Sequence, residues 1–317
     1  MNASETTVLI SDPLPVATKQ ILVGAGLKVI EGVDQVESSL GSISGWILRS
    51  GTQITAELLD KAPDLRCICR AGAGVDNIDC DAAAERGVLV MNTPAANSNA
   101  AAEHAIGLMF ALARNIPQGH ARMSTGGWDR ENLVGIELEG KTLLVIGLGK
   151  IGQRVCCKGS GLGMKVLGCD PFVNAEDIAS VPAELEELDG ALSRADFITL
   201  HPQLNDATRG MVDDDFIARC KDGVRIVNVS RGPVIDASAL VRGIDSGKVA
   251  GAAIDVYDQE PPAEDDPFRS HPGIICTPHL GASTVEAQHN VGIQSAHQMV
   301  AFLAEGKIEN AVNAPRL

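Results

Sequence analysis

Three polar side chains suited to acid/base chemistry or anion binding follow short apolar runs in the last third of the chain. RIVNVS leads to Arg231, GAAIDVY leads to Glu260, and IICTP leads to His279. Apolar runs of this length, bounded by Gly and Pro, predict buried parallel strands. Because ligands lie beyond the carboxyl ends of such strands, we expect a cation, a carboxylate and an imidazole to converge on one crevice.

Removal of a proton from a substrate hydroxyl needs a base, and the three residues could divide the work of binding and proton transfer. His279 is the candidate base, because imidazole titrates near working pH. Glu260 could hold the ring and favour its protonated form, which is the acid in the reductive direction. Arg231 offers a forked, permanently charged donor to a carboxylate or a developing carbonyl oxygen.

Each of the three also has an ordinary interpretation. Arg231 could form a structural salt bridge, Glu260 could be a solvated loop acid before two prolines, and His279 could be a turn residue after a proline. Their occurrence at three successive strand ends favours the catalytic interpretation.

A glycine-rich motif earlier in the chain predicts a dinucleotide site. The expected strand TLLVI runs into GLGKIG, a G-x-G-x-x-G pattern from Gly147 through Gly149 to Gly152. A helix-compatible stretch follows, and then a second strand that leads to Asp170, at the distance the dinucleotide fingerprint requires. The alternative is a glycine-rich turn in a ligand-free α/β domain.

Each position of this motif has a physical role. Gly147 permits the tight turn, Gly149 lets the backbone approach a pyrophosphate, and Gly152 allows helix and strand to pack closely. The helix N-terminus offers free N–H groups to the phosphates. Asp170 can accept hydrogen bonds from ribose hydroxyls and would repel a 2′-phosphate, which favours NAD over NADP. His201 follows a strand and is expected to border this cofactor, whereas His104, His289 and His297 lie on helices and are weaker candidates.

Strands alternate with helical stretches along the chain, which predicts an α/β protein with two Rossmann-like or flavodoxin-like parallel-sheet domains and a cleft between them. Residues 99–114 are expected to form an Ala-rich connecting helix, residues 284–303 a final helix, and 117–139 a polar, irregular segment. The expected strands are 7–10, 27–30, 45–48, 66–69, 88–91, 142–146, 165–169, 197–200, 225–229, 252–256 and 273–276.

Composition limits the partners. The 317 residues suffice for about two domains. A formal net charge of −15 argues against nucleic acid or an anionic membrane, so an anionic substrate must be held by a few arginines at short range. No apolar stretch is long enough to span a membrane, and no signal peptide is evident, so a cytoplasmic location is expected. The eight cysteines form no C-x-x-C pair, so we expect reduced thiols and no metal.

The chain resembles the D-isomer-specific 2-hydroxyacid dehydrogenases and, within that family, the phosphoglycerate dehydrogenases. The resemblance covers nearly the whole chain, in the segments ILRSGTQIT, CRAGAGVDNID, VLVMNTPAANS, GIELEGKTLLVIGLGKIG, GMKVLGCDP, VRIVNVSRGPVID, GAAIDVYDQEPP and CTPHLGASTVEAQ.

The resemblance implies roles for particular residues. Arg231, Glu260 and His279 fall on the family's catalytic positions. Asp255 is implied to face the nicotinamide carboxamide, and the other cofactor positions are Gly147, Gly149, Lys150, Ile151, Gly152, Asp170, Pro202, Val229, His279 and Gly281. Anionic substrate is implied to bind at Arg49 and Arg70 and at the loop with Gly72 and Gly74.

The resemblance also implies the domain organisation. Residues 1–97, completed by 285–317, would form a substrate-binding lid, and 98–284 the NAD-binding Rossmann domain. A homodimer or higher homo-oligomer is implied, with partner contacts in the segment 127–139. Since the sequence ends at Leu317 without the C-terminal regulatory domain of longer phosphoglycerate enzymes, no serine feedback through such a domain is expected.

Three departures from the family's pattern stand out. Ala73 occupies a position that often carries Thr, so one hydroxyl contact is lost. His201-Pro202-Gln203 replaces the more usual His-x-Pro, which puts the cofactor contact of Pro202 in doubt. Pro233 occupies a position that is commonly Gly.

The expected function is NAD-dependent oxidation of a D-2-hydroxy acid, or its reverse, with 3-phosphoglycerate as the leading substrate, as in serine biosynthesis. Another member of the class, such as a glyoxylate or hydroxypyruvate reductase, would share the same three residues and differ in the distal pocket. A non-enzymatic alternative is an NAD-sensing protein like the corepressors that share this architecture.

Overall fold

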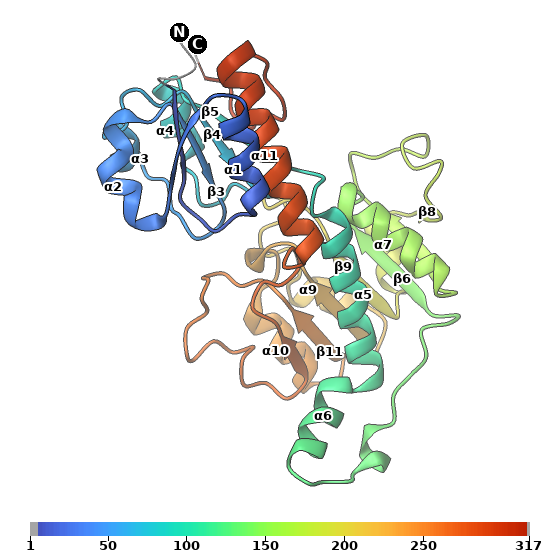
Figure 1. The fold of residues 1–317 in the computed structure, drawn as a ribbon. Coiled ribbons are helices and arrows are strands. Elements are labelled where there is room, and N and C mark those ends of the chain that lie inside the picture. The colour runs from blue at the N-terminus through green and yellow to red at the C-terminus, as the bar shows by residue number, and fades with distance from the viewer. Residues whose placement is uncertain (1–5, 316–317) are drawn as a thin grey trace. The chain divides into compact units, whose positions relative to one another are not determined.

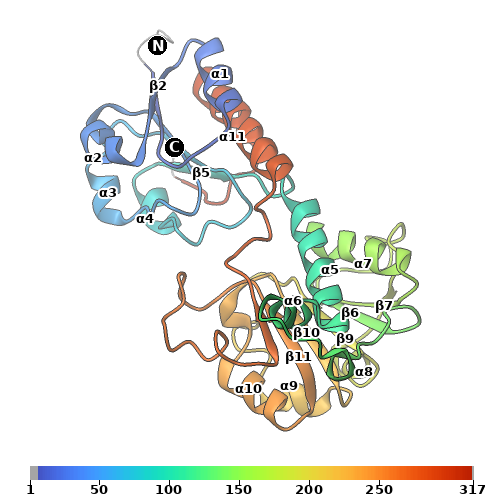
Figure 2. The same cartoon turned by 60° about the horizontal axis from the view of Figure 1, so that its bottom comes forward.

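A computed structural model describes residues 6–315, which form two compact units (Figures 1 and 2). The first unit comprises the residues up to Ser98 together with those from Ala282 onward, and the second runs from Asn99 to Gly281. Between residues 6 and 315, no helix has the length and apolar character needed to cross a membrane.

The first unit is built on a five-stranded parallel sheet with the order β2-β1-β3-β4-β5. Helix α11, from the C-terminal part of the chain, packs against α1 in this unit (Figure 1). The strands are β1 (Thr7–Ile10), β2 (Lys28–Glu31), β3 (Gly45–Leu48), β4 (Cys67–Arg70) and β5 (Leu89–Asn92). The helices are α1 (Val16–Gly24), α2 (Val36–Ser39), α3 (Ala56–Asp60), α4 (Cys80–Glu85) and α11 (Val285–Glu305).

The second unit is built on a seven-stranded parallel sheet with the order β12-β11-β10-β9-β6-β7-β8. Its central strands are apolar on both faces because helices cover both sides, and one hydrophobic core lies on each face. The strands are β6 (Thr142–Ile146), β7 (Lys165–Cys169), β8 (Glu184–Leu185), β9 (Phe197–Leu200), β10 (Val224–Asn228), β11 (Val249–Ile254) and β12 (Ile274–Cys276). The helices are α5 (Ser98–Arg114), α6 (Ile116–Ser124), α7 (Lys150–Gly161), α8 (Leu188–Leu192), α9 (Asp214–Arg219) and α10 (Ala237–Asp245).

These two sheets confirm the predicted α/β fold class. Five of the expected strands have the bounds that the sequence predicts, namely β1, β3, β6, β7 and β9. The prediction of an irregular segment over 117–139 is partly wrong, because α6 occupies Ile116–Ser124. Pro117 lies at the first turn of α6, where the missing N–H costs nothing, and Asn115 in a left-handed conformation (φ 51°) separates α6 from α5.

Strands β10, β11 and β12 are neighbours and run parallel to one another. Their carboxyl ends therefore lie along one edge of the sheet. The loops that carry the three predicted catalytic residues leave from this edge, and β6, which leads into the glycine motif, belongs to the same sheet.

Candidate active site

The turn that carries Arg231 is held by the last residue of β10. The buried Asn228 side chain donates from Nδ2 to the carbonyl oxygen of Arg231 (2.9 Å), and its Oδ1 accepts the Ser230 N–H (3.0 Å). Arg231 itself donates from Nη1 to the Ser230 carbonyl (2.7 Å). At Gly232, a Cβ would lie 2.0 Å from the carbonyl carbon of Tyr257, so only glycine permits this close approach. The approach brings the Arg231 turn against the segment that leads to Glu260.

Glu260 is fixed by one backbone and one side-chain partner. Its Oε1 accepts the N–H of Tyr257 (3.1 Å), and its Oε2 lies 2.6 Å from Nδ1 of His279. Burial alone would raise the pKa of Glu260, but the hydrogen bond and charge of His279, together with the Tyr257 N–H, hold it below its usual value. Glu260 therefore stays ionised beside the imidazole at neutral pH.

His279 adopts a backbone conformation that is uncommon for this residue type. Its φ of 54° lies in the left-handed region. The backbone N–H of His279 donates to the carbonyl oxygen of Asp255 (2.9 Å), which ties this strained position to the end of β11. Such strain persists only where the surroundings over-determine it, and it often marks a functional site.

The side chain of Asp255 supplies this over-determination. It is fully buried and accepts the N–H groups of Leu280 (2.8 Å) and Gly281 (2.9 Å) and the hydroxyl of Thr277 (2.6 Å). Residues 277–281, which we call the His279 loop, are thus bonded to Asp255 on both sides of the histidine. Burial alone would raise the pKa of Asp255, but hydrogen bonds from His104, Thr277 and Leu280 hold it below its usual value.

The glycine motif forms a tight turn between β6 and α7. Gly147 has a φ of 90°, and a Cβ there would lie 2.6 Å from the carbonyl carbon of His201. A Cβ at Gly152 would lie 1.9 Å from the carbonyl oxygen of Gly147, so helix and turn are in direct contact. At Gly149, by contrast, a Cβ would meet open space, and within the described part of the chain no side chain caps the N-terminus of α7. The backbone N–H groups there are accessible to a phosphate, as a dinucleotide requires.

Asp170 and His201 border this turn. Asp170 follows β7 and accepts the N–H of Leu148 (2.8 Å) and that of Phe172 (3.0 Å), so it is anchored to the turn and keeps lone pairs for hydroxyl donors. His201 follows β9, with its Nε2 2.9 Å from the Thr199 hydroxyl. Burial lowers the pKa of His201 to about 3, so the ring is neutral, and its buried Nδ1 has no hydrogen-bond partner among residues 6–315.

The remaining predicted cofactor positions lie at the same edge of the sheet or at the start of α7. Lys150 and Ile151 begin α7, Pro202 follows β9, Val229 follows β10, and Gly281 ends the His279 loop. The residues present thus fit a dinucleotide, since an open glycine turn, an uncapped helix N-terminus and an anchored carboxylate follow one another in the order the ligand needs.

The four predicted substrate residues lie in the first unit. Arg49 follows β3 and Arg70 ends β4, so both stand at the carboxyl edge of the five-stranded sheet. Gly72 has a φ of 155°, and a Cβ there would lie 1.8 Å from Nη1 of Arg70, so this glycine makes room for the arginine. Gly74 follows in the same loop, between β4 and α4.

Sequence analysis missed the importance of His104 and did not single out Thr277. His104, on α5, lies with its Nε2 3.1 Å from Oδ1 of Asp255 and 3.2 Å from the hydroxyl of Thr277. A signal was present, because His104 is a polar residue between the buried residues Ala102 and Ala105. The sequence could not show which strand end this helix would meet.

The parallel sheet and the glycine turn are the features of a dinucleotide-binding α/β domain, and the Glu260–His279 pair lies at the carboxyl edge of the same sheet. Residues 106–281 match the model of the family "D-isomer specific 2-hydroxyacid dehydrogenase, NAD binding domain". The chain belongs to this family, whose NAD-binding domain covers most of the second unit.

Individual proteins show the same relationship. The chain is 43% identical over 314 residues to D-3-phosphoglycerate dehydrogenase of Rattus norvegicus, covering 98% of this chain and 59% of the rat protein. It therefore spans about three-fifths of that relative's length. A glyoxylate reductase from Paecilomyes thermophila superimposes with a TM-score of 0.86 at 29% identity, covering 98% of this chain and 99% of the other. D-lactate dehydrogenase of Aquifex aeolicus, solved with NAD and lactic acid, gives a TM-score of 0.83 at 28% identity, covering 98% and 100%.

Proposed function

We propose that this protein is an NAD-dependent dehydrogenase that interconverts a D-2-hydroxy acid and its 2-oxo acid. The observation that carries the proposal is the 2.6 Å contact between Glu260 Oε2 and His279 Nδ1, at the carboxyl edge of the sheet that also carries the glycine turn. A carboxylate–imidazole pair beside a dinucleotide site is the arrangement that oxidation of an alcohol needs.

His279 is the proton acceptor in the oxidative direction. Because the Glu260 carboxylate can only accept a hydrogen bond, Nδ1 of His279 carries the proton, and the lone pair of Nε2 is left for the substrate hydroxyl. When the hydroxyl proton arrives at Nε2, the negative charge of Glu260 stabilises the imidazolium. In reduction the same proton returns to the carbonyl oxygen.

Arg231 holds the reacting acid. Its guanidinium offers several fixed N–H donors, and the Ser230 carbonyl bond uses one nitrogen to set the orientation of the group. The planar N–H donors of a guanidinium suit a carboxylate or the oxygen on which charge develops. The Asn228 bonds hold the turn, so the guanidinium is presented from a rigid strand end.

The second unit holds NAD, which accepts the hydride when bound. The pyrophosphate would lie over Gly147, Gly149 and the start of α7, at Lys150 and Ile151, while Asp170 would accept bonds from the adenosine ribose. Support for these assignments comes from the open space at Gly149 and from the anchoring of Asp170 by Leu148. Gly152, Pro202, Val229, Asp255 and Gly281 would border the rest of the cofactor.

The first unit supplies the substrate-binding lid, and 3-phosphoglycerate is the proposed substrate, with 3-phosphohydroxypyruvate as product. Arg49 and Arg70 stand at one sheet edge and would hold anionic oxygens, and the backbone of the Gly72–Gly74 loop would cradle a carboxylate. The similarity to a D-3-phosphoglycerate dehydrogenase over 98% of this chain supports this substrate. Two arginines at one sheet edge would also allow a chain of net charge −15 to bind an anion at short range.

A second candidate substrate class is glyoxylate or hydroxypyruvate, favoured by the fold shared with a glyoxylate reductase at a TM-score of 0.86. The test is NADH absorbance with 3-phosphoglycerate, glycerate and D-lactate in oxidation, and with glyoxylate and hydroxypyruvate in reduction. We expect the highest kcat/KM with 3-phosphoglycerate. A clear preference for glycerate or glyoxylate would contradict the phosphate assignment, and no turnover of any acid would contradict the dehydrogenase itself.

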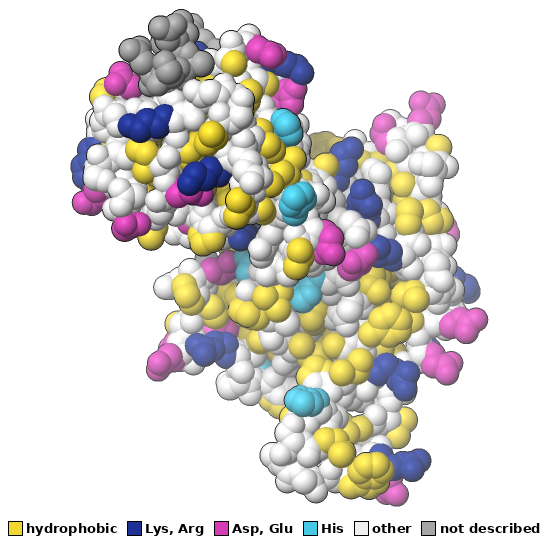
Figure 3. All heavy atoms as spheres, viewed as in Figure 1, with side chains coloured by type: hydrophobic (Ala, Val, Ile, Leu, Met, Phe, Trp, Pro, Cys, Tyr) yellow, Lys and Arg dark blue, Asp and Glu magenta, His cyan; other side chains and the backbone are white. Residues whose placement is uncertain are grey.

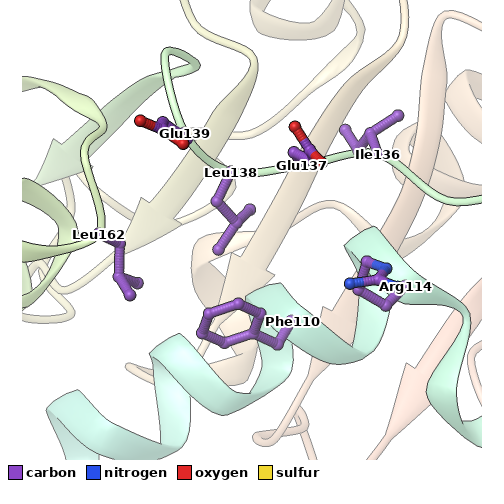
Figure 4. Close-up of a pocket in the computed structure, with 7 residues that line it drawn as sticks. All are labelled: Phe110, Arg114, Ile136, Glu137, Leu138, Glu139 and Leu162. Atoms are coloured by element: carbon purple, nitrogen blue, oxygen red, sulfur yellow. The ribbon is translucent and has the colours of Figure 1, made fainter.

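The proposal includes a homodimer formed through the second unit. The α6 arm (residues 116–135) exposes large hydrophobic side chains, including Ile116, Trp128 and Val134, and Figure 3 shows hydrophobic side chains gathered in this region at the bottom of the view. Beside it, Phe110 and Leu138 line an open pocket between α5 and the segment 136–139 (Figure 4). Light scattering should give a dimer, and the double variant Trp128→Asp/Val134→Asp should give a monomer. A monomeric unmodified protein would contradict this part of the proposal.

A further inference from the structure

We infer that His104 is a positioning residue for the His279 loop: its Nε2–H, donated from α5, fixes the buried Asp255 carboxylate to which that loop is bonded. The inference rests on the proposed function, in which His279 transfers the substrate proton. It concerns a side chain on a helix that carries none of the catalytic groups.

The first step concerns the burial of the Asp255 carboxylate and the elements that supply its hydrogen-bond partners. Its carboxylate is buried, and a buried carboxylate is tolerated only when it is fully hydrogen-bonded. Among residues 6–315, four groups are hydrogen-bonded to the Asp255 carboxylate. Three of them belong to the His279 loop, and the fourth is the His104 ring on α5. Without His104, the loop would keep its bonds to Asp255 and the end of β11, to the Tyr257 hydroxyl through the Thr277 carbonyl (3.0 Å), and to Glu260 through His279, but the Asp255 carboxylate would lose its bond to α5.

The second step is the direction of the hydrogen bond. The Thr277 hydroxyl donates its proton to Asp255 Oδ1 (2.6 Å), and the ionised carboxylate has none to give. Nε2 of His104 lies 3.1 Å from the same carboxylate oxygen and 3.2 Å from the hydroxyl oxygen. It must therefore be the donor to both. A neutral ring with Nε2–H and a protonated ring can each make these bonds, so the support does not depend on the charge of His104.

The third step is packing between α5 and the loop. A Cβ at Gly281 would lie 3.3 Å from Asp255 Oδ2 and 3.8 Å from Cβ of Ala101, one turn before His104 on α5. Gly281 thus faces Ala101 of α5, and a side chain at this position would meet both the helix and the Asp255 carboxylate. His279 holds a left-handed φ of 54° within this loop, and a conformation of that kind needs support from both flanks.

Loss of the His104 donor should affect the rate of proton transfer more than the overall fold. A shift of His279 by a fraction of an ångström lengthens the path of the proton while substrate affinity changes little. Loss of the His104 donor should therefore lower kcat with a small change in KM. It should also loosen the amides of Leu280 and Gly281, which donate to Asp255.

The experiment compares His104→Met, which keeps the approximate length and removes the donor, with His104→Gln, which keeps an N–H donor. The matched control is His271→Met, because His271 forms a similar pair with Asp245 (3.2 Å) in the same unit, where Asp245 is largely exposed. Amide exchange of Leu280 and Gly281 is measured by NMR in each protein, together with kcat and KM.

We expect exchange at these two amides to become about tenfold faster in His104→Met, with kcat reduced about 10- to 100-fold, and to stay near the wild-type values in His104→Gln and His271→Met. The inference is overturned if His104→Met behaves like the wild type, if His104→Gln is as impaired as His104→Met, or if His271→Met loosens the same amides.

A measurement on the unmodified protein covers the case in which a variant does not fold. Nitrogen NMR of the His104 ring should show Nε2 protonated at every pH at which the protein is folded. An unprotonated Nε2 would overturn the inference. The two claims fail separately: a wild type without turnover on any 2-hydroxy acid would contradict the proposed function, while the amide exchange and ring protonation still decide the role of His104.

Discussion

In each of the two units a buried aspartate holds a loop that carries a proposed site residue, and the two aspartates differ in how their carboxylate oxygens are used. In the first unit, Asp12 accepts the N–H groups of Arg49 (2.6 Å) and Thr52 (3.3 Å) on Oδ2, while Oδ1 accepts the Thr52 hydroxyl (3.0 Å). In the second unit, both oxygens of Asp255 accept a backbone N–H, one from Leu280 and one from Gly281.

Their further support differs as well. The Arg49 loop is completed by a neutral amide, since Asn77 donates from Nδ2 to the carbonyl oxygens of Arg49 (2.7 Å) and Thr52 (2.6 Å). The His279 loop is completed by the imidazole of His104. This difference agrees with the proposed roles, in which the Arg49 loop presents a cation to the substrate and the His279 loop must place a proton-transferring nitrogen accurately.

The largest expected effect is that of His279→Ala. Loss of the base should reduce kcat by about 10²- to 10⁴-fold, because general acid/base catalysis contributes that much. NAD affinity, measured by calorimetry, should fall far less than kcat, since the glycine turn is intact. A variant that retains most of its turnover would show that the His279 loop does not carry the chemistry.

Arg49→Ala tests the other loop and should act on binding. Loss of a charged donor to the substrate should raise KM about 10- to 100-fold while kcat is largely retained. Steady-state kinetics with 3-phosphoglycerate separate the two parameters. A fall in kcat as large as that of His279→Ala, with KM unchanged, would contradict the proposal that the Arg49 loop binds substrate and the His279 loop transfers the proton.

The smallest effects separate the two aspartates. In Asp12→Asn, the amide oxygen can keep both N–H groups and the NH₂ can donate to the Thr52 hydroxyl. In Asp255→Asn, the NH₂ must face either Leu280 N–H or Gly281 N–H, which leaves a buried donor unpaired at a cost of about 1–3 kcal/mol. Denaturant unfolding should therefore show a larger loss for Asp255→Asn. Equal losses would contradict the comparison.

The pH dependence of that loss has a definite sign. Because the pKa of Asp255 is lowered from 3.8 in the folded protein, its carboxylate stabilises the fold above that pH and ceases to do so as the pH falls through the folded value. The difference in unfolding free energy between the wild type and Asp255→Asn should therefore narrow below pH 3.8. A difference that widened under acid would contradict the assigned direction.

The fold could be predicted from the sequence wherever burial sets the pattern. Strands such as β6 and β9 are continuous apolar runs, and their bounds follow from the flanking residues. The two-residue strand β8 has no such signal, because Glu184 is exposed and pairing with β7 alone defines it. Helix α6 was missed because its proline and polar residues also suit a loop.

In the candidate site, too, some residues could be predicted from the sequence and others could not. Glu260 and His279 follow apolar runs, and the structure joins them by a hydrogen bond. The anchors Asp12 and His104 could not be found from the sequence, because each acts on a loop far away in the chain. Their partners become visible only when the strands and helices are packed.

The central claim is that Glu260 and His279 act as one acid/base pair, and the pH dependence of kcat/KM for the wild type and Glu260→Gln tests it most directly. The pKa of Glu260 lies below its usual value, so this side chain is negatively charged in the wild type, and its charge favours the protonated form of the neighbouring His279 ring. In the oxidative direction, the acidic limb of the kcat/KM profile should therefore lie at lower pH in Glu260→Gln than in the wild type, with a reduced maximum rate. A profile that coincides with that of the wild type would contradict the account.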